Sequence, residues 1–383
     1  MGRLRWNADK QYRWRFGTGR WWIFFAGGVA VVALVKGFAL THIFPHQEER
    51  SLPVHVVVEE EQQLPVAASK AESPAQIRKG QSDKNVSTGD KLSSYDRLRV
   101  QVYLATDKRM EKLPIELYVR GVLAAEMPIE FELEALKAQA IAARTYIYRR
   151  LYAGENDGLP PNAANADVTD SVKHQVYLSL NELFSRWKGE QKKVNLNKLN
   201  QAVEETKGQI ITYGNEPIQA AFFSTSNGFT ENAADYWSMD LPYLRSVASP
   251  WDKDLSPRYK EITTFKLSDA AERLGVKANE IRSMRVIETT EGKRVKEVAI
   301  GKKRFSGREV REKLGLASSQ FNWTIEQEFI SITTYGFGHG VGMSQWGANG
   351  MAKEGSTAEQ IISHYYTGTQ VEQASKLPIP GSS

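Results

Sequence analysis

Glu126 is the only acidic residue in the otherwise apolar segment 121–128, which ends at Pro128. A carboxyl group in apolar surroundings has a raised pKa, because its charged form is poorly solvated there. A raised pKa keeps such a group protonated near neutral pH, as general acid catalysis requires. The pattern therefore indicates a catalytic acid, although an exposed carboxylate at the end of a helix would give the same sequence.

A second segment, residues 336–347, has glycine at four alternate positions and also contains His339, Ser344 and Gln345. Glycine adopts positive φ angles and lets a ligand approach the backbone closely. The segment lacks the Gly-Lys-Ser/Thr ending of a phosphate-binding loop, and its one histidine has no second metal ligand at helical spacing. We expect these three side chains to form a polar, substrate-binding wall, with a purely structural turn as the alternative.

Hydroxyl and amide side chains occur beside aromatic rings in residues 222–230, and Tyr236 follows shortly after. This combination suits a sugar, which has apolar ring faces and polar edges. We expect Ser224, Ser226 and Tyr236 to bind substrate. A serine nucleophile is disfavoured because no Gly-x-Ser-x-Gly motif surrounds these serines, but a pairing with His339 stays open. Ordinary polarity of an edge strand is the alternative.

Lys137 and Arg144 are seven residues apart in an Ala-rich segment, which places them on one face of a predicted helix. The residues between them are uncharged, which indicates a surface that packs; a solvated basic face is the alternative. A cation close to Glu126 would lower its pKa and oppose its role as an acid. We therefore expect Lys137 and Arg144 to hold substrate or neighbouring carboxylates.

Residues 167–177 contain two carboxylates and His174, a combination that could hold a metal ion. The chain has no cysteine, so a metal site would depend on histidine and carboxylate ligands alone. A loop that leads into a strand is the favoured explanation of this segment. We predict no metal and no other cofactor.

Hydrophobic periodicity predicts an α+β fold. Pro128 should end one helix and Gly154 the next. From about residue 265 the expected elements are short helices and strands, which indicates a small inserted α/β subdomain at about residues 261–328. The expected elements are a strand at 98–104, helices at 115–125 and 132–152, a loop at 156–170, one or two helices at 181–206, strands at 210–213 and 218–224, a helix at 269–274, strands at 281–288 and 295–300, a helix at 307–314, a strand at 329–334 and a helix at 358–366.

The N-terminal segment differs in charge from the rest of the chain. Seven of the 50 Lys and Arg residues, but only one of the 45 acidic residues, lie within residues 1–44. The remainder is nearly neutral, so a nucleic-acid partner is not indicated.

Residues 21–44 are dominated by apolar side chains. As a helix they would reach ~36 Å at ~1.5 Å per residue, enough to cross a hydrocarbon core of ~30 Å. The basic residues before this run predict a cytoplasmic tail at 1–20 and an exported remainder. An uncleaved anchor is favoured over a cleaved signal peptide, because the small-x-small cleavage pattern is missing. We expect a flexible linker at 45–95, a folded domain at 96–375 and a tail at 376–383.

Five segments, in this order, resemble the stage II sporulation protein D family of bacterial cell-wall enzymes over roughly residues 97–372. The last of them is the most specific. They are Gly-Val-Leu-Ala-Ala-Glu-Met-Pro at 121–128, Glu-Ala-Leu-Lys-Ala-Gln-Ala-Ile-Ala-Ala-Arg-Thr-Tyr at 134–146, Asp-Val-Thr-Asp-Ser-Val-Lys-His-Gln-Val-Tyr at 167–177, Ser-Thr-Ser-Asn-Gly at 224–228 and Gly-His-Gly-Val-Gly-Met-Ser-Gln-Trp-Gly-Ala at 338–348.

The resemblance implies a membrane-anchored lytic transglycosylase. Such an enzyme cleaves the bond between N-acetylmuramic acid (MurNAc) and N-acetylglucosamine (GlcNAc) in peptidoglycan glycan strands and leaves 1,6-anhydro ends. The resemblance further implies that Glu126 is the catalytic residue and that Lys137 and Arg144 line the cleft. Some members bind zinc through cysteines near residues 169–174, and this chain has none.

The same resemblance implies a cellular setting. The chain is expected to act in forespore engulfment during sporulation, in the mother-cell membrane, on strands that lack stem peptides. Its implied partners are an amidase–endopeptidase and a membrane protein of the engulfment machinery. A non-catalytic glycan-binding scaffold that stimulates a partner amidase is one alternative, and a hydrolase of the same bond is another.

Overall fold

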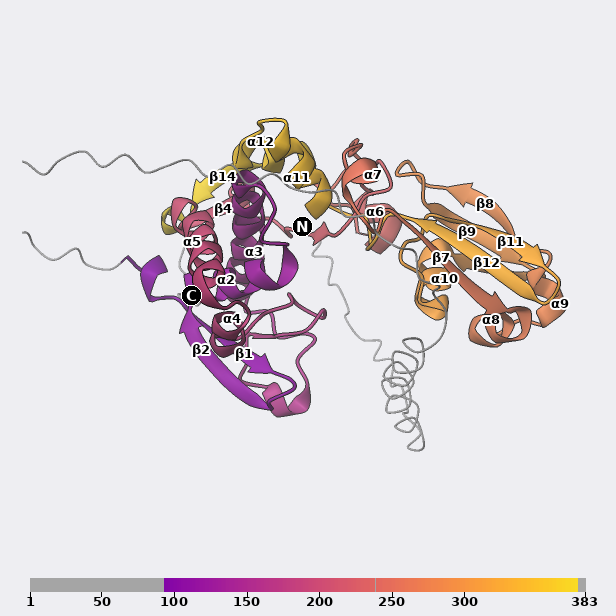
Figure 1. Ribbon diagram of the computed structural model, residues 1–383, viewed down its shortest axis with the longest axis horizontal. Coiled ribbons are helices and arrows are strands. Elements are labelled where there is room, and N and C mark those ends of the chain that lie inside the picture. The colour runs from indigo at the N-terminus through magenta and orange to yellow at the C-terminus, as the bar shows by residue number, and fades with distance from the viewer. Residues whose placement is uncertain (1–92, 238, 378–383) are drawn as a thin grey trace, which may run out of the picture. The chain divides into compact units, whose positions relative to one another are not determined.

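The computed structural model describes residues 93–237 and 239–377, which form helices and several small sheets (Figure 1). This mixed content confirms the α+β prediction. The expected cytoplasmic tail, membrane span and nearly all of the expected linker fall outside the described residues. Within the described ranges, none of the helices combines the length and the apolar character that crossing a bilayer requires.

The first sheet leads into the helix that carries Glu126. β1 (Arg99–Leu104) pairs antiparallel with β2 (Arg109–Pro114) and parallel with β3 (Val168–Thr169). Alternation along β1 buries Val100 and Val102, as the sequence predicts. β2 was not expected, because Leu113 is its only buried side chain and it therefore shows no period.

Two helices end at the positions that Pro128 and Gly154 predict. α2 (Ile115–Glu126) stops because Met127, which precedes a proline, is extended, with φ −119° and ψ 137°. α3 (Leu133–Ala153) ends at Gly154, which is left-handed with φ 63°. Glu126 is consequently the last residue of α2, at a helix terminus next to a sharp change of chain direction.

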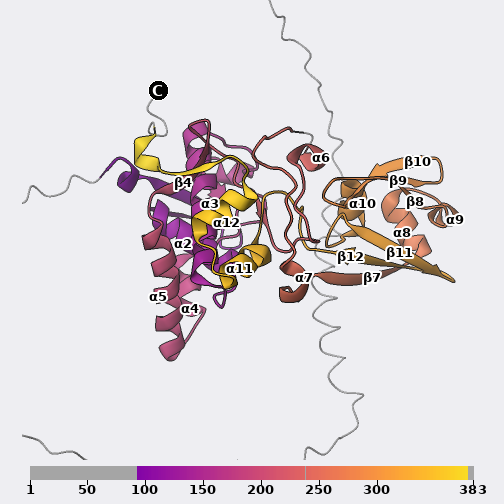
Figure 2. The same ribbon diagram turned by 90° about the horizontal axis from the view of Figure 1, so that it is seen from above.

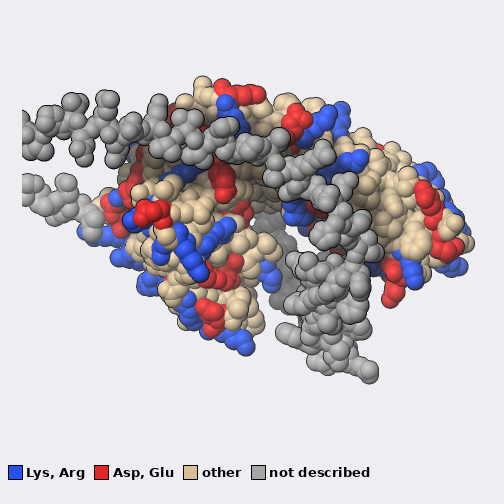
Figure 3. All heavy atoms as spheres, in the orientation of Figure 1, with Lys and Arg blue, Asp and Glu red and all other residues tan. Residues whose placement is uncertain are grey.

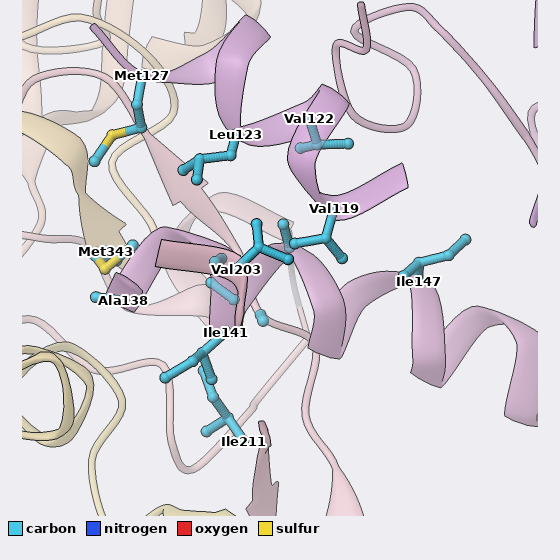
Figure 4. Close-up of a cluster of buried hydrophobic side chains, with 14 of the residues drawn as sticks. Val119, Val122, Leu123, Met127, Ala138, Ile141, Ile147, Val203, Ile211 and Met343 are labelled. Carbon is cyan, nitrogen blue, oxygen red and sulfur yellow. The ribbon is translucent and has the colours of Figure 1, made fainter. Parts of the chain in front are cut away.

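The largest buried cluster surrounds α3. Its alanines bring neighbouring helices close, and Ala138 and Ile141 lie among buried side chains of α2 and near Met343 (Figure 4). α11 and α12 lie beside α3 in both ribbon views (Figure 2). The helices packed against α3 are α2, α5 (Gly189–Glu205), α11 (Gln345–Lys353) and α12 (Ala358–Tyr365).

The region after α3 differs in part from expectation. Residues 181–206 form a pair of helices, α4 (Leu180–Ser185) and α5. The strand expected at 218–224 is wrong as a single element, because the backbone turns where Ala221 N–H donates to the Gln219 carbonyl at 2.9 Å. The strands here are β5 (Glu216–Pro217), which joins β4 (Gln209–Tyr213) and β14 (Gln370–Gln373), and β6 (Phe222–Phe223), which pairs parallel with β13 (Met343–Ser344).

Residues 260–335 build two further sheets around a separate buried cluster that includes Leu274, Val298 and Ile332. The strand expected at 281–288 begins later, because residues 278–281 are helical. One sheet has the order β11 (Phe321–Glu326), β12 (Phe329–Tyr335), β7 (Lys260–Lys266). The other has the order β10 (Lys303–Ser306), β9 (Val295–Ile300), β8 (Arg285–Thr289), and the helices are α8 (Leu267–Leu274), α9 (Ala278–Ile281) and α10 (Gly307–Leu314).

Short elements complete the described chain. They are the 3-10 helices η1 (Tyr95–Arg97), η2 (Pro161–Ala163) and η3 (Ala374–Lys376) and the helices α6 (Ala233–Trp237) and α7 (Asp252–Leu255). Acidic and basic side chains are interspersed on the face shown in Figure 3.

Arg294 connects the 260–335 segment to residues 222–230 by hydrogen bonds and packs against the glycine-rich loop, residues 336–347. Its guanidinium is buried and donates to the Phe229 carbonyl at 3.2 Å, and Glu231 lies 3.8 Å away. A Cβ on Gly340 would lie 2.3 Å from this guanidinium, so only glycine lets the loop pass so close. Burial lowers the pKa of Arg294 to about 10, so it stays charged at neutral pH.

Asp252, at the start of α7, connects two loops that carry predicted site residues, 222–230 and 336–347, which we call the motif loops. Its buried carboxylate accepts hydrogen bonds from the Ser226 backbone N–H at 2.7 Å and from the Ser249 hydroxyl at 2.8 Å. The hydroxyls of Ser226 and Ser344 also donate to it. Because the donors come from both residues 222–230 and residues 336–347, Asp252 fixes these segments relative to each other.

We predict that Asp252→Ala lowers the free energy of unfolding by about 3 kcal/mol or more, because it leaves several buried donors without an acceptor. Urea unfolding monitored by circular dichroism measures the change. Asp254→Ala, on the exposed side of the same helix, is the control and should stay within about 0.5 kcal/mol of the unsubstituted chain. Equal effects of the two substitutions would contradict the structural role of Asp252.

Candidate functional site

Glu126 lies where two adjoining cavities meet. Its half-buried side chain lines a first cavity of about 350 Å³ and a second cavity of about 400 Å³. Ser224 and Gln345 also line both, so the three side chains form the boundary between the cavities. A chain-like ligand could thus extend to either side of the Glu126 carboxyl group.

Two donors orient the Glu126 carboxyl group. The Val176 backbone N–H donates to Oε1 at 3.0 Å, and the Gln345 amide donates to Oε2 at 3.4 Å. Burial raises the pKa of Glu126, and both hydrogen bonds oppose that rise because they favour the charged form. Within the described ranges no Lys or Arg forms an ion pair with Glu126. The carboxyl group is therefore set up to bind and release a proton at a higher pH than an ordinary glutamate.

Gly121 makes the contact with Val176 possible. A Cβ at this position would lie 2.2 Å from the Tyr177 ring, so the segment after β3 can cross α2 here only over a glycine. The Leu178 N–H donates to the Gly121 carbonyl at 3.3 Å and fixes the crossing. The Val176 N–H consequently reaches the end of α2, one turn and a half beyond Gly121.

The first cavity combines aromatic rings with uncharged polar groups. No Lys or Arg lines it, and Glu126 is its only carboxylate among the described residues. Rings and amides in this proportion suit the apolar faces and the polar edges of an N-acetylated sugar. Its aromatic lining comes from Tyr146, Phe222, Phe223, Trp237 and Phe337, and its amide lining from Gln175, Gln219 and Gln345.

His339 lines the first cavity but is poorly suited to acid–base chemistry. Its Nδ1 accepts a hydrogen bond from the Val341 N–H at 3.1 Å, and its ring lies 5.4 Å from that of Trp237. Burial, with the nearby charges of Arg311 and Arg294, lowers the pKa of His339 to about 3. The imidazole is therefore neutral near pH 7 and forms part of the cavity wall.

The Ser–His pairing left open by the sequence is not formed. The Ser224 hydroxyl lies 3.2 Å from the Thr225 hydroxyl and lines both cavities, as a substrate-binding residue would. Ser226 is fully buried against Asp252, so it cannot reach a ligand.

Two other predicted substrate contacts support the walls from behind. Ser344 is fully buried and caps the N-terminus of α11 by accepting the Gly347 N–H at 3.3 Å. Tyr236 lies 5.8 Å from the His339 ring and accepts a hydrogen bond from Arg311 at 3.0 Å. Neither side chain lines the two cavities.

The two predicted cations of α3 lie away from the cavities and hold carboxylates of the protein. The Arg144 side chain is completely buried and pairs with Glu116 at 2.7 Å. Lys137 pairs with Glu134 at 2.8 Å and Glu205 at 3.1 Å. We expected these two side chains to hold substrate or neighbouring carboxylates, and the structure shows them paired with neighbouring carboxylates.

His174 also lines the first cavity, but its ring nitrogens are bound to the protein. The Thr169 N–H donates to Nδ1 at 3.2 Å, so Nε2 carries the proton and donates to the Asp157 carbonyl at 3.1 Å. No group of three histidine or carboxylate side chains that could hold a metal occurs within the described part of the chain.

Several contributors to the site had no signal in the sequence. Val176 acts through its backbone N–H, which no side-chain pattern reveals. Trp187 and Arg186 line the second cavity from a segment that looks like an ordinary surface helix. Gln219 and Gln175 are isolated amides in the sequence. The turn after β5 brings Gln219 to the cavity that Glu126 lines, and the crossing over Gly121 brings Gln175 there.

Comparison with known proteins places this chain in a family. A family model described as "Stage II sporulation protein" matches residues 103–213. The stage II sporulation protein D of Bacillus subtilis is 45% identical over 294 residues, which cover 76% of this chain and 84% of the relative. The protein of the same name from Bacillus amyloliquefaciens is 47% identical over 276 residues, or 72% and 79% of the two chains.

A more distant relative carries a different name. The "Amidase enhancer" of Bacillus subtilis is 28% identical over 305 residues, which cover 66% of this chain and 40% of that protein. The extent and identity of the first two matches decide the assignment: the chain belongs to the stage II sporulation protein D family.

Proposed function

We propose that the chain is a lytic transglycosylase that cleaves peptidoglycan glycan strands between MurNAc and GlcNAc, with Glu126 as the only acid–base residue. The observation that carries this proposal is a half-buried carboxyl group of raised pKa at the junction of two cavities. Ordinary glycosidases need a second carboxylate to activate water or attack the sugar. The first cavity has none, and the second has only Glu130, which is exposed.

In the proposed reaction, protonated Glu126 donates its proton to the glycosidic oxygen. The bond from that oxygen to C1 of MurNAc breaks, GlcNAc leaves with a free 4-hydroxyl, and C1 acquires oxocarbenium character. The Glu126 carboxylate then removes the proton from the C6 hydroxyl of MurNAc as O6 bonds to C1. The products are a 1,6-anhydro end and regenerated acid, and no water is consumed.

The hydrogen bonds to Glu126 suit both halves of this cycle. The Val176 N–H and the Gln345 amide stabilise the carboxylate that exists after the first proton transfer. Burial stabilises the acid that must be present before it. A pKa set by two opposing contributions lets one group act first as acid and then as base.

The proposed setting is the wall between two membranes in sporulating cells. Family membership supports a role in sporulation. The apolar run at 21–44 supports a single membrane anchor, with the folded domain outside the cytoplasm and facing the septal space of the mother-cell membrane. We further propose that it acts in forespore engulfment with an amidase–endopeptidase and a membrane protein of the same machinery.

A second candidate function is a glycan-binding scaffold that stimulates an amidase. The similarity to a protein named amidase enhancer favours it. In that case Glu126→Gln would leave stimulation of the amidase intact, and purified protein would release no anhydro sugars.

We predict that Glu126→Gln lowers the rate of strand cleavage by ~10²–10⁴-fold, because it removes the general acid and base while it preserves size and hydrogen bonding. Mass spectrometry of the released fragments measures both the rate and the chemistry. The unsubstituted chain should give anhydro ends, which are one water lighter than reducing ends.

Glu130→Gln is the matched control, because Glu130 is the other carboxylate of the second cavity. It should retain cleavage and the anhydro products. Reducing ends only, or an equal loss of rate in both variants, would show that a carboxylate pair hydrolyses the bond and would contradict the proposal.

We also predict that Gln345→Leu moves the alkaline limb of the pH–rate profile to higher pH. Glu126 must be protonated to donate, so kcat/KM falls as the pH rises through its pKa. The Gln345 amide lowers that pKa, and its removal should therefore raise it. Gln219→Leu, in the same cavity but without a hydrogen bond to Glu126, should leave the limb in place. A shift to lower pH in Gln345→Leu would contradict the assignment of the limb to Glu126.

A further inference from the structure

The second cavity beside Glu126 contains a cation that the proposed reaction does not use. Arg186, which follows α4, is exposed and lines this cavity together with Trp187. Its guanidinium carbon lies 5.4 Å from the centre of the Trp187 ring. Across residues 93–237 and 239–377, no carboxylate forms an ion pair with it. An unpaired guanidinium at a binding cavity is available to an anionic group of a ligand.

Positive charge is present on one side of Glu126 only. No Lys or Arg lines the first cavity, and its two histidines have lowered pKa values because burial disfavours their charged forms. The cavities therefore differ in what they can recognise. The first offers rings and amides, and the second offers rings and a cation.

The two sugars of a glycan strand differ in the same way. Both carry an N-acetyl group, but MurNAc also bears a lactyl ether. The carboxyl group of that ether is a free anion when no stem peptide is attached and a neutral amide when one is. The carboxylates of a stem peptide lie several bonds farther from the ring, so only a peptide-free MurNAc presents an anion close to it.

We propose that Arg186 binds the free lactyl carboxylate of a peptide-free MurNAc in the second cavity and so selects strands that have lost their stem peptides. This inference rests on the proposed function and assigns a specificity-determining residue to the preference for peptide-free strands that the family resemblance implies. The planar guanidinium matches a carboxylate in shape and can donate two parallel hydrogen bonds to it. The guanidinium lies over the Trp187 ring, and this cation–π contact holds it at the cavity.

The assignment also gives the strand a direction across the site. The bond to be cleaved joins C1 of MurNAc to O4 of GlcNAc, and Glu126 lies between the cavities. With MurNAc in the second cavity, the leaving GlcNAc occupies the first, where the rings and amides are. Glu130, the other exposed charged residue of the second cavity, would repel the lactyl carboxylate. Its neutralisation is therefore not expected to weaken binding.

The test measures binding by the full-length chain with Glu126→Gln, so that strands are not consumed. The probes are peptide-free glycan strands with free lactyl carboxylates and the same strands after conversion of these groups to methylamides. We expect the free-carboxylate strands to bind about fivefold more tightly at low salt, as for a partly exposed Arg–carboxylate pair. The difference should shrink as salt is added.

Arg186→Gln in the same background should remove this preference, and Arg186→Lys should retain part of it. Lys188→Gln, a neighbouring exposed cation that lines neither cavity, is the matched control and should keep the full preference. Thermal unfolding of each variant verifies that the fold is intact. Equal binding of both kinds of strand by the parent, or an unaltered preference in folded Arg186→Gln, would overturn the inference.

The outcome separates this inference from the proposed function. Binding that depends on Arg186, in a chain that releases no anhydro ends, would uphold the inference and contradict the transglycosylase. Release of anhydro ends together with binding that is independent of Arg186 would do the reverse.

Discussion

The site depends on one buried carboxylate, that of Asp252. Its hydrogen bonds reach the backbone and hydroxyl of Ser226 in one motif loop and the hydroxyl of Ser344 in the other. A buried charge is costly unless it is fully hydrogen-bonded, so this arrangement is stable only when both loops are in place. Because the loops are joined from behind, Ser224 and Gln345 are held at the front, where they border Glu126.

Asp252 and Glu126 show how environment separates a structural carboxylate from a chemical one. Burial raises the pKa of both, but Asp252 is enclosed by donors and lines neither of the two cavities, whereas Glu126 has two donors and lines both. Asp252 therefore stabilises the two motif loops, while Glu126 can exchange a proton with a ligand. Carboxyl groups in different environments of one protein commonly take different roles in this way.

Elements with a strong local signal could be predicted from the sequence, and contacts between distant segments could not. The Ala-rich helix, its stop at Gly154 and the stop of α2 before Pro128 follow from local sterics. β2 and α11 have no clear period, since one is nearly all exposed and the other is rich in small residues. Among the residues that line the cavities, sequence reasoning named Glu126, Ser224, His339 and Gln345. It could not separate Ser226 and Ser344 from them, because only the position of Asp252 makes those two hydroxyls structural. Arg186 gave no signal, since its place beside Glu126 depends on a cavity lined by the end of α2, the residues after α4 and the start of α11.

The central claim is that poor hydration keeps the Glu126 carboxyl group protonated at a pH where an ordinary glutamate is ionised. The most direct measurement is the pH titration of this one carboxyl group, followed by NMR on chain with ¹³C-labelled glutamate side chains and assigned with Glu126→Gln. The account predicts one resonance, absent from the variant, with a midpoint above the ordinary glutamate pKa. A midpoint at or below the ordinary value would mean that Glu126 is well solvated, and it would contradict the account.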